Sequence, residues 1–153
     1  MPGDRVALLD VNVLIALFDP DHIHHEAAHA WFEDNRAAGW ATCPTTESGF
    51  LRVLSNPAYG AAVSRPLELV ARLRQFCASS DHAFWPATVS LLDENVFNLS
   101  LIRGHRQLTD VYLLGLAVRV GGRLVTFDRT IPHGAVVGAT REHVAVVAPV
   151  VEQ

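Results

Sequence analysis

Four acidic residues stand where a parallel sheet would bring them together. Asp10 directly follows the apolar residues 6–9, and Asp128 directly follows the largely apolar residues 124–127. Glu47 and Asp110 fall in the first turns of two segments with helical periodicity. In open α/β sheets, ligands bind beyond the carboxyl ends of the strands, where the following helices begin. We therefore expect a cluster of carboxylates at that edge, a type of site suited to metal-ion chemistry.

Helical spacing directs two of these acids toward the protein interior. Residues three, four and seven positions after each acid share its helix face. For Glu47 they are Phe50, Leu51 and Leu54, and for Asp110 they are Leu113, Leu114 and Ala117. Each acid taken alone also fits a structural role, as a turn former or as an acid at a helix N-terminus. Four clustered acids would repel one another, so together they favour a hard divalent cation such as Mg²⁺ or Mn²⁺.

The elements that must position these acids follow from apolar periodicity and from turn residues. The predicted strands are residues 6–9, 40–43, 83–85, 124–127 and 143–147. The predicted helices are residues 11–18, 22–38, 45–54, 66–78, 89–101 and 109–120. This alternation predicts an α/β fold with three α/β/α layers and a mainly parallel central sheet, in a single domain over residues 1–153.

The basic residues exclude several kinds of enzyme. All twelve are arginines, so the chain has no lysine for a Walker A loop, a Schiff base or a lysine-assisted aspartyl phosphate. The net charge of −4 argues against a module that holds nucleic acid by bulk positive charge, but leaves room for an enzyme with local arginines.

Cysteine usage and hydropathy point to a cytoplasmic protein without a membrane segment. Cys43 and Cys77 form no metal-binding pattern, which favours reduced, buried thiols. The apolar run over residues 6–18 is interrupted by Asp10 and Asn12, and it is too short to span a bilayer.

Four histidines near residue 25 raise the question of a zinc site. His25 and His29 are one helical turn apart, and His22 and His24 lie just before them. No cysteine or third well-spaced ligand joins them, so exposed or helix-capping roles are favoured over zinc.

The segments that carry the four acids resemble a PIN domain, and more narrowly the VapC-type toxins of bacterial toxin–antitoxin pairs. These segments are VALLDVNVLIALF, TTES, LTDVYLLGLA and LVTFD, and the likeness extends from Val6 to about Pro149. DHIHHEAAHAWF and SLIRGHRQLTD are also similar to the corresponding parts of that family. One departure is Asn12, because this position is often Ser or Thr in these toxins.

The resemblance implies a metal-dependent endoribonuclease that cleaves structured RNA, with tRNA as the first candidate, and leaves 5′-phosphate and 3′-hydroxyl ends. Asp10, Glu47, Asp110 and Asp128 would hold one or two Mg²⁺ or Mn²⁺ ions, directly or through water. Asn12 and Thr109 would lie behind these acids and orient them or metal-bound water. The resemblance also implies a cognate VapB-type antitoxin that silences the enzyme, and a homodimer.

Arginines near the acids are candidates for RNA contacts. Arg103 and Arg106 shortly precede Asp110, and Arg129 follows Asp128. An arginine fork matches phosphate geometry, although a solvated loop or an ion pair with a site acid are the alternatives. Phe18 and Trp31, with neighbouring apolar residues, are candidates for a groove that accepts an antitoxin helix.

Three alternative functions fit these residues less well. A haloacid-dehalogenase-like phosphatase shares the Asp10-Val11-Asn12-Val13 pattern only in part, because its second acid and its lysine are both missing. A catalytically silent scaffold that binds RNA or protein, and a structure-specific DNA nuclease, remain as alternatives.

Overall fold

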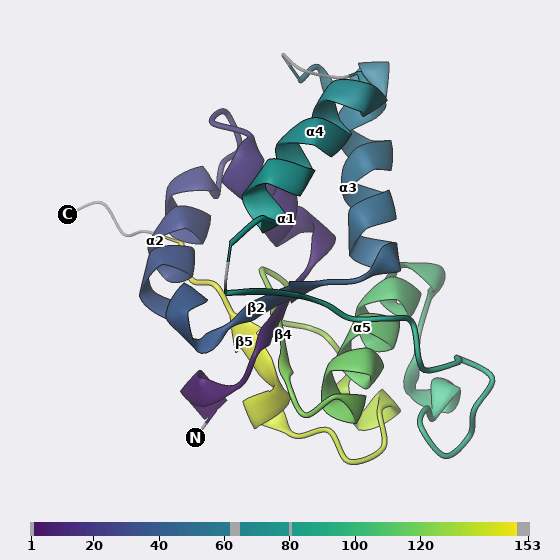
Figure 1. Ribbon diagram of the computed structural model, residues 1–153. Coiled ribbons are helices and arrows are strands. Elements are labelled where there is room, and N and C mark those ends of the chain that lie inside the picture. Colours follow the sequence, from purple (N-terminus) through teal and green to yellow (C-terminus); the bar gives the residue numbers. More distant parts are fainter. Residues whose placement is uncertain (1, 62–64, 80, 150–153) are drawn as a thin grey trace.

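The computed structural model describes residues 2–61, 65–79 and 81–149, and its centre is a parallel sheet of five strands (Figure 1). The strands are β1 (Ala7–Leu9), β2 (Trp40–Thr42), β3 (His82–Phe84), β4 (Arg123–Thr126) and β5 (Val144–Val146), in the order β3-β2-β1-β4-β5. Leu8 of β1 is in register with Ala41 of β2 and with Leu124 of β4. The predicted parallel sheet is confirmed, and β1 is its central strand.

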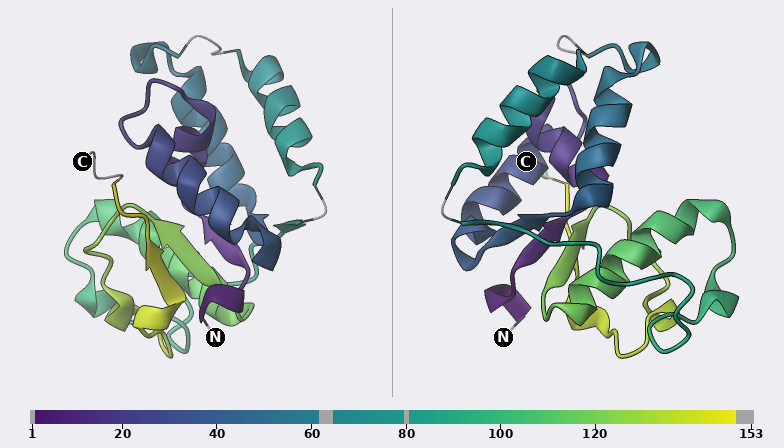
Figure 2. Two further views of the ribbon diagram at one scale, coloured as in Figure 1. Left: turned by 90° about the vertical axis from the view of Figure 1, so that its left-hand side faces the viewer. Right: turned by 45° about the vertical axis from the view of Figure 1, so that its right-hand side comes forward.

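Helices cover both faces of the sheet, with α1–α4 on one side and α5 on the other (Figure 2). The α-helices are α1 (Val11–Phe18), α2 (His25–Asn35), α3 (Pro44–Ser55), α4 (Pro66–Cys77) and α5 (Leu108–Arg119). The 3₁₀ helices are Pro2–Asp4, Arg36–Ala38, Pro57–Tyr59, Leu99–Leu101, His105–Gln107, His133–Ala135 and Arg141–His143. The three-layer α/β/α arrangement is therefore as predicted.

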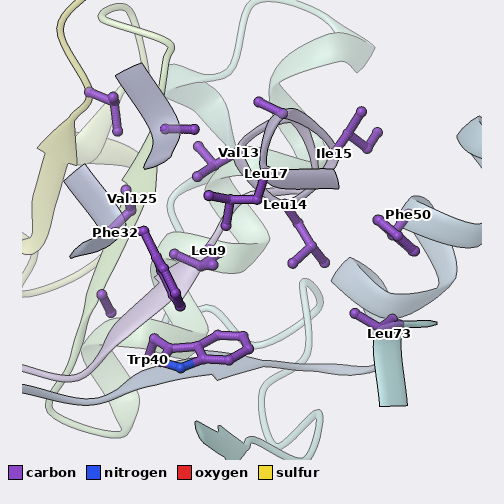
Figure 3. Close-up of a cluster of buried hydrophobic side chains, with 14 of the residues drawn as sticks. Leu9, Val13, Leu14, Ile15, Leu17, Phe32, Trp40, Phe50, Leu73 and Val125 are labelled. Atoms are coloured by element: carbon purple, nitrogen blue, oxygen red, sulfur yellow. The ribbon is translucent and has the colours of Figure 1, made fainter. Parts of the chain in front are cut away.

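The alternation of side chains along the strands builds two apolar cores. Ala7 and Leu9 face α1–α4, whereas Leu8 faces α5. On the α1–α4 side, Trp40 is fully buried beside Phe32, and their ring centroids are 5.3 Å apart (Figure 3). The ring centroid of Phe76 lies 4.9 Å from that of Trp40. Phe32 lies on α2 and Phe76 on α4, so this packing holds those two helices against the sheet. The helices α1 and α3 follow β1 and β2 directly and begin at the carboxyl edge of the sheet.

The prediction of a helix over residues 89–101 is wrong. The chain there is irregular, with turns, a 3₁₀ turn at its end and an isolated antiparallel bridge between Phe97 and Val136. Ser90 and Asp93 accept hydrogen bonds from backbone N–H groups two residues ahead, at 3.1 and 2.9 Å, and thereby compete with helix formation. The apolar spacing in this segment serves packing beneath α5 instead, since Phe97 is buried there.

Other boundaries differ by a few residues. The predicted helix 22–38 begins only at His25 and gives way to a 3₁₀ turn after Asn35, and Gly39 ends this turn with a φ of 98°. None of the helices in the described ranges is both long and apolar enough to cross a membrane.

Gly122, which leads into β4, provides a test of this packing. A Cβ at this position would lie 2.6 Å from the carbonyl oxygen of Val6 and 2.4 Å from the ring of Trp85. We expect Gly122→Ala to lower the free energy of unfolding by about 1–3 kcal/mol, because the backbone oxygen cannot move aside. Urea denaturation measures the change. Gly104→Ala is the matched control, since a Cβ there meets nothing within 4 Å; equal stability of the two variants would contradict the packing described here.

Candidate active site

Three carboxylates meet at the carboxyl edge of the sheet: those of Asp10, Asp110 and Asp128, here called the acid trio. Asp10 follows β1, and Asp128 follows the neighbouring strand β4 after one intervening residue. Asp110 lies in the first turn of α5, which packs against both of these strands. The three side chains thus come from the two central strands and from the helix beneath them.

Asp10 is buried, with 5% of its surface exposed, and two hydrogen bonds hold its side chain. It is the N-cap of α1, and its Oδ1 accepts a hydrogen bond of 2.7 Å from the backbone N–H of Val11. Its Oδ2 accepts a hydrogen bond of 2.9 Å from the hydroxyl of Thr126 at the end of β4. The carboxylate is therefore fixed in orientation as soon as α1 forms and β1 pairs with β4.

Thr126 connects two members of the acid trio. Its hydroxyl donates to Asp10 and accepts a hydrogen bond of 3.1 Å from the backbone N–H of Asp128. The Asp128 carboxylate is held in turn through Oδ1, which accepts from the backbone N–H and the hydroxyl of Thr130, each at 2.7 Å. We did not predict the role of Thr126. Side chains alternate along a strand, so Thr126 lies on the same face of β4 as Leu124. This alternation is the signal in the sequence that could have indicated its position.

Two acids of the trio, Asp110 and Asp10, have raised pKa values. Burial is the main reason that the pKa of Asp110 rises from 3.8 to about 7, and the negative charges of Asp10 and Asp128 raise it further. The pKa of Asp10 is also raised, chiefly by burial and to a smaller degree by Asp128, although its two hydrogen bonds act in the opposite direction. The protein thus holds negative charge where water and cationic side chains compensate it poorly.

This donor set fits a hard divalent cation. The ion pairs found in the described parts of the chain are Arg36–Asp81 and Arg65–Glu68, and neither involves the acid trio. The same described residues contain no group of three or more His, Cys, Asp or Glu side chains already spaced as ligands of one ion. An ion such as Mg²⁺, which retains several waters, matches carboxylates that approach it partly through water.

Glu47, the fourth predicted acid, has different neighbours. It lies in the first turn of α3, which follows β2 (Figure 1), and its Oε2 accepts a hydrogen bond of 2.8 Å from the hydroxyl of Thr42. The groups whose charges raise the pKa of Asp110 do not include Glu47. The charge of Glu47 acts instead on two other groups. Burial and then the charge of Glu47 raise the pKa of Cys77, whereas burial lowers the pKa of His82 and the charge of Glu47 opposes that shift. Glu47 therefore belongs to the same edge but to the side of β2 and β3.

The remaining predicted residues lie on the surface. Asn12 and Thr109 are exposed in the first turns of α1 and α5, and neither forms a side-chain hydrogen bond to a site acid in the ranges that the structure describes. Arg103, Arg106 and Arg129 are exposed as well, and in those ranges none of them forms an ion pair with the acid trio. The guanidinium groups are thus accessible from solvent.

The histidines cap a helix. Nδ1 of His25 lies 2.7 Å from the carbonyl oxygen of Ala16, and Nε2 of His29 lies 2.8 Å from that of Leu17. These carbonyls belong to the last turn of α1, where they have no partner within the helix. The capping role favoured from the sequence is therefore confirmed for this pair.

The two aromatic residues considered for a partner groove lie in different places. Phe18 lines a cavity of about 610 Å³ together with Tyr59 and Arg72, and Trp31 is not among the lining residues. Trp31, which belongs to α2, instead lies against Arg123, and the guanidinium carbon of Arg123 is 5.4 Å from the centroid of the Trp31 ring.

Known proteins are similar to this chain over most of its length. The PIN domain family model matches residues 7–136. The chain is 48% identical to Ribonuclease VapC44 of Mycobacterium tuberculosis (strain ATCC 25618 / H37Rv), over 91% of this chain and 97% of that protein. It is 43% identical to Ribonuclease VapC39 of the same strain, over 86% and 95% of the two chains. It is 48% identical to Ribonuclease VapC38, over 80% and 85%.

The raised pKa of Asp110 predicts a pH-dependent loss of stability in metal-free protein. Between its ordinary value of 3.8 and its folded value of about 7, the folded state retains a proton that the unfolded state has released. Stability contributed by protonated Asp110 is therefore complete at low pH and is lost as the pH rises toward 7. Asp110→Asn cannot ionise, so we expect it to be more stable than the unaltered chain at pH 8, by about 1–2 kcal/mol after discounting for partial exposure.

Urea denaturation in EDTA at pH 4.5 and pH 8 measures this difference. The two proteins should be nearly equal in stability at the lower pH. The carboxylate of Asp110 near the N-terminus of α5 stabilises that helix by about 0.3–1 kcal/mol, which opposes the expected gain but is smaller. If Asp110→Asn is less stable than the unaltered chain at pH 8, the raised pKa of Asp110 is contradicted.

Proposed function

This chain belongs to the PIN domain family, and from that membership we propose that it is a VapC-type toxin that hydrolyses RNA phosphodiester bonds with bound Mg²⁺ or Mn²⁺. The observation that carries the proposal is the acid trio: burial and neighbouring carboxylates raise the pKa of Asp10 and Asp110, and the trio has no cationic ion-pair partner among the described residues. Its relatives of known name are ribonucleases, which agrees with this use of the site.

The side chains of the proposed site have two different roles, holding the metal ions and positioning the ligands. Asp10, Asp110, Asp128 and Glu47 are the residues that would hold the metal ions. When bound, such an ion lowers the pKa of a water molecule and neutralises charge on the phosphate. Thr126 keeps Asp10 and the backbone of Asp128 in fixed positions, so that these ligands need little reorganisation when an ion binds. The chain contains no lysine, and the acid trio consists of aspartate side chains alone.

RNA recognition is assigned to exposed arginines around the site. Arg103 and Arg106 precede Asp110 in the chain, Arg129 follows Asp128, and all three side chains are exposed. One guanidinium group can donate two parallel hydrogen bonds to the oxygens of a phosphate. Such groups therefore suit the RNA backbone on either side of the scissile bond. We propose structured RNA, with tRNA tested first, as the substrate, and inhibition of translation and growth as the consequence.

The proposed physiological setting is a toxin–antitoxin pair in the cytoplasm. A VapB-type antitoxin would block the active site, and the toxin would act as a homodimer. Co-expression with a candidate VapB-type antitoxin, followed by purification of the complex and measurement of its mass, tests both proposals.

Substitution of the acid trio tests the activity. We expect Asp10→Ala and Asp110→Asn each to reduce Mg²⁺-dependent cleavage of RNA at least about a hundredfold, since each removes transition-state stabilisation of several kcal/mol. Induced expression followed by mapping of new 5′ ends in cellular RNA, and cleavage of purified tRNA, are the measurements. Asp34→Asn, an exposed acid on α2, is the matched control and should retain full activity.

Three outcomes would revise the proposal. Full activity of Asp10→Ala or Asp110→Asn would remove these acids from the active site. Cleavage of branched DNA but not RNA would favour a structure-specific DNA nuclease. Binding of RNA or of a protein partner without metal-dependent cleavage would favour a catalytically silent scaffold.

Binding of the ion is tested separately from catalysis. A ligand that binds only the folded state adds about 2.7 kcal/mol at a hundredfold excess over its Kd. We therefore expect Mn²⁺ or Mg²⁺ to raise the thermal midpoint of the unaltered chain by about 5–10 °C. Differential scanning fluorimetry should show little or no such rise for Asp10→Ala, whereas Asp34→Asn should behave as the unaltered chain. The same rise in Asp10→Ala would place the ion elsewhere.

A further inference from the structure

A chain of hydrogen bonds links Glu47 to the edge strand of the sheet. The hydroxyl of Thr42, at the end of β2, donates to Oε2 of Glu47 at 2.8 Å. The same hydroxyl oxygen lies 2.8 Å from Nε2 of His82, the first residue of β3. Thr42 is fully buried, so water does not replace either contact.

The number of available protons determines which group donates in each of these two hydrogen bonds. A hydroxyl has one proton, and Thr42 donates it to a carboxylate oxygen, which can only accept. Nε2 of His82 must therefore carry a proton and donate it to the Thr42 oxygen. The direction runs from His82 through Thr42 to Glu47, and it requires the Nε2–H tautomer of His82.

Neighbouring groups do not reverse this direction. The Cys77 thiol is the other possible acceptor near Thr42, but burial, and then the charge of Glu47, raise its pKa to about 11. It remains a neutral thiol, which is a weaker acceptor than a carboxylate. Burial also lowers the pKa of His82, although the charge of Glu47 opposes this shift, and a lowered pKa favours the neutral ring at pH 7 and above.

We propose that Thr42 and His82 are positioning residues for the active site: they hold Oε2 of Glu47 so that Oε1 is presented to the metal or substrate. This inference rests on the proposed function, because it gives Glu47 a role there. A free glutamate at a helix N-terminus samples several rotamers, and each bond that fixes it removes an entropy cost at binding. In the described residues no hydrogen bond joins Glu47 to the acid trio, so Thr42 is the side chain that holds its carboxylate.

Paired substitutions at the two positions separate hydrogen bonding from packing. Thr42→Val keeps the shape of the side chain and removes the hydroxyl, whereas Thr42→Ser keeps the hydroxyl. His82→Leu removes the donor, whereas His82→Gln keeps an N–H donor near the place of Nε2. We expect Thr42→Val and His82→Leu to lower kcat about 10–100-fold with little change in KM, and Thr42→Ser and His82→Gln to recover most of the loss.

A double-mutant cycle tests whether the effect passes through Glu47. In a Glu47→Ala background, Thr42→Val should cause no further loss of kcat, because the group that it positions is absent. Losses that multiply in the double variant would show a merely structural effect and would overturn the inference. Equal activity of Thr42→Val and Thr42→Ser would overturn it as well. Urea denaturation of each variant confirms that folded protein is compared.

Two further measurements keep the inference distinct from the proposed function. ¹⁵N NMR of labelled histidine in the unaltered chain should show the Nε2–H tautomer of His82, and crystal structures should show Glu47 in one rotamer in Thr42→Ser but displaced in Thr42→Val. An Nδ1–H tautomer, or an unmoved Glu47 in Thr42→Val, overturns the positioning role even if RNA is cleaved. If the unaltered chain cleaves no RNA, the proposed function fails, while the tautomer and the rotamer still decide whether Glu47 is held in this way.

Discussion

The burial of Asp10 at the end of the central strand is the constraint on which the site depends. A carboxylate removed from water costs several kcal/mol unless donors surround it. Here the donors are the first N–H of α1 and the hydroxyl of Thr126, at 2.7 and 2.9 Å. Both are available only if α1 starts directly after β1 and if β4 pairs with β1 in the observed register. Sheet register and active-site geometry are therefore one requirement.

That requirement extends from Asp10 to the charges around it. The same hydroxyl that donates to Asp10 also accepts from the backbone of Asp128, so fixing one acid brings the next one into place. Asp110 then enters from α5 on the opposite face, and burial together with its two neighbours raises its pKa to about 7. The fold tolerates this repulsion because large apolar cores lie on both faces of the sheet. Stored repulsion of this kind is released when a cation binds.

Part of this arrangement could be predicted from the sequence, because strand ends and helix starts share one edge in any parallel sheet. The positions of Asp10, Asp110 and Asp128 follow from that rule alone. The parts that could not be predicted depend on strand order. Thr126 reaches Asp10 because β4 lies beside β1, and Thr42 reaches His82 because β3 lies beside β2. Periodicity along one chain does not reveal which strands are neighbours, and it also suggested a helix over residues 89–101, where apolar side chains fill a core from an irregular backbone.

The distribution of positive charge completes the physical account. A chain with a net charge of −4 and only arginines as bases would be expected to neutralise its most crowded acids with those arginines. In the described ranges the arginine ion pairs are instead with Asp81 and Glu68, away from the trio. The three arginines proposed to contact RNA, Arg103, Arg106 and Arg129, are exposed. An ion pair within the trio would lower its affinity for a cation, whereas an exposed guanidinium nearby leaves that affinity intact and still attracts phosphate. Keeping the two charges apart in the free protein would leave the proposed metal ion and the proposed RNA backbone a place between them.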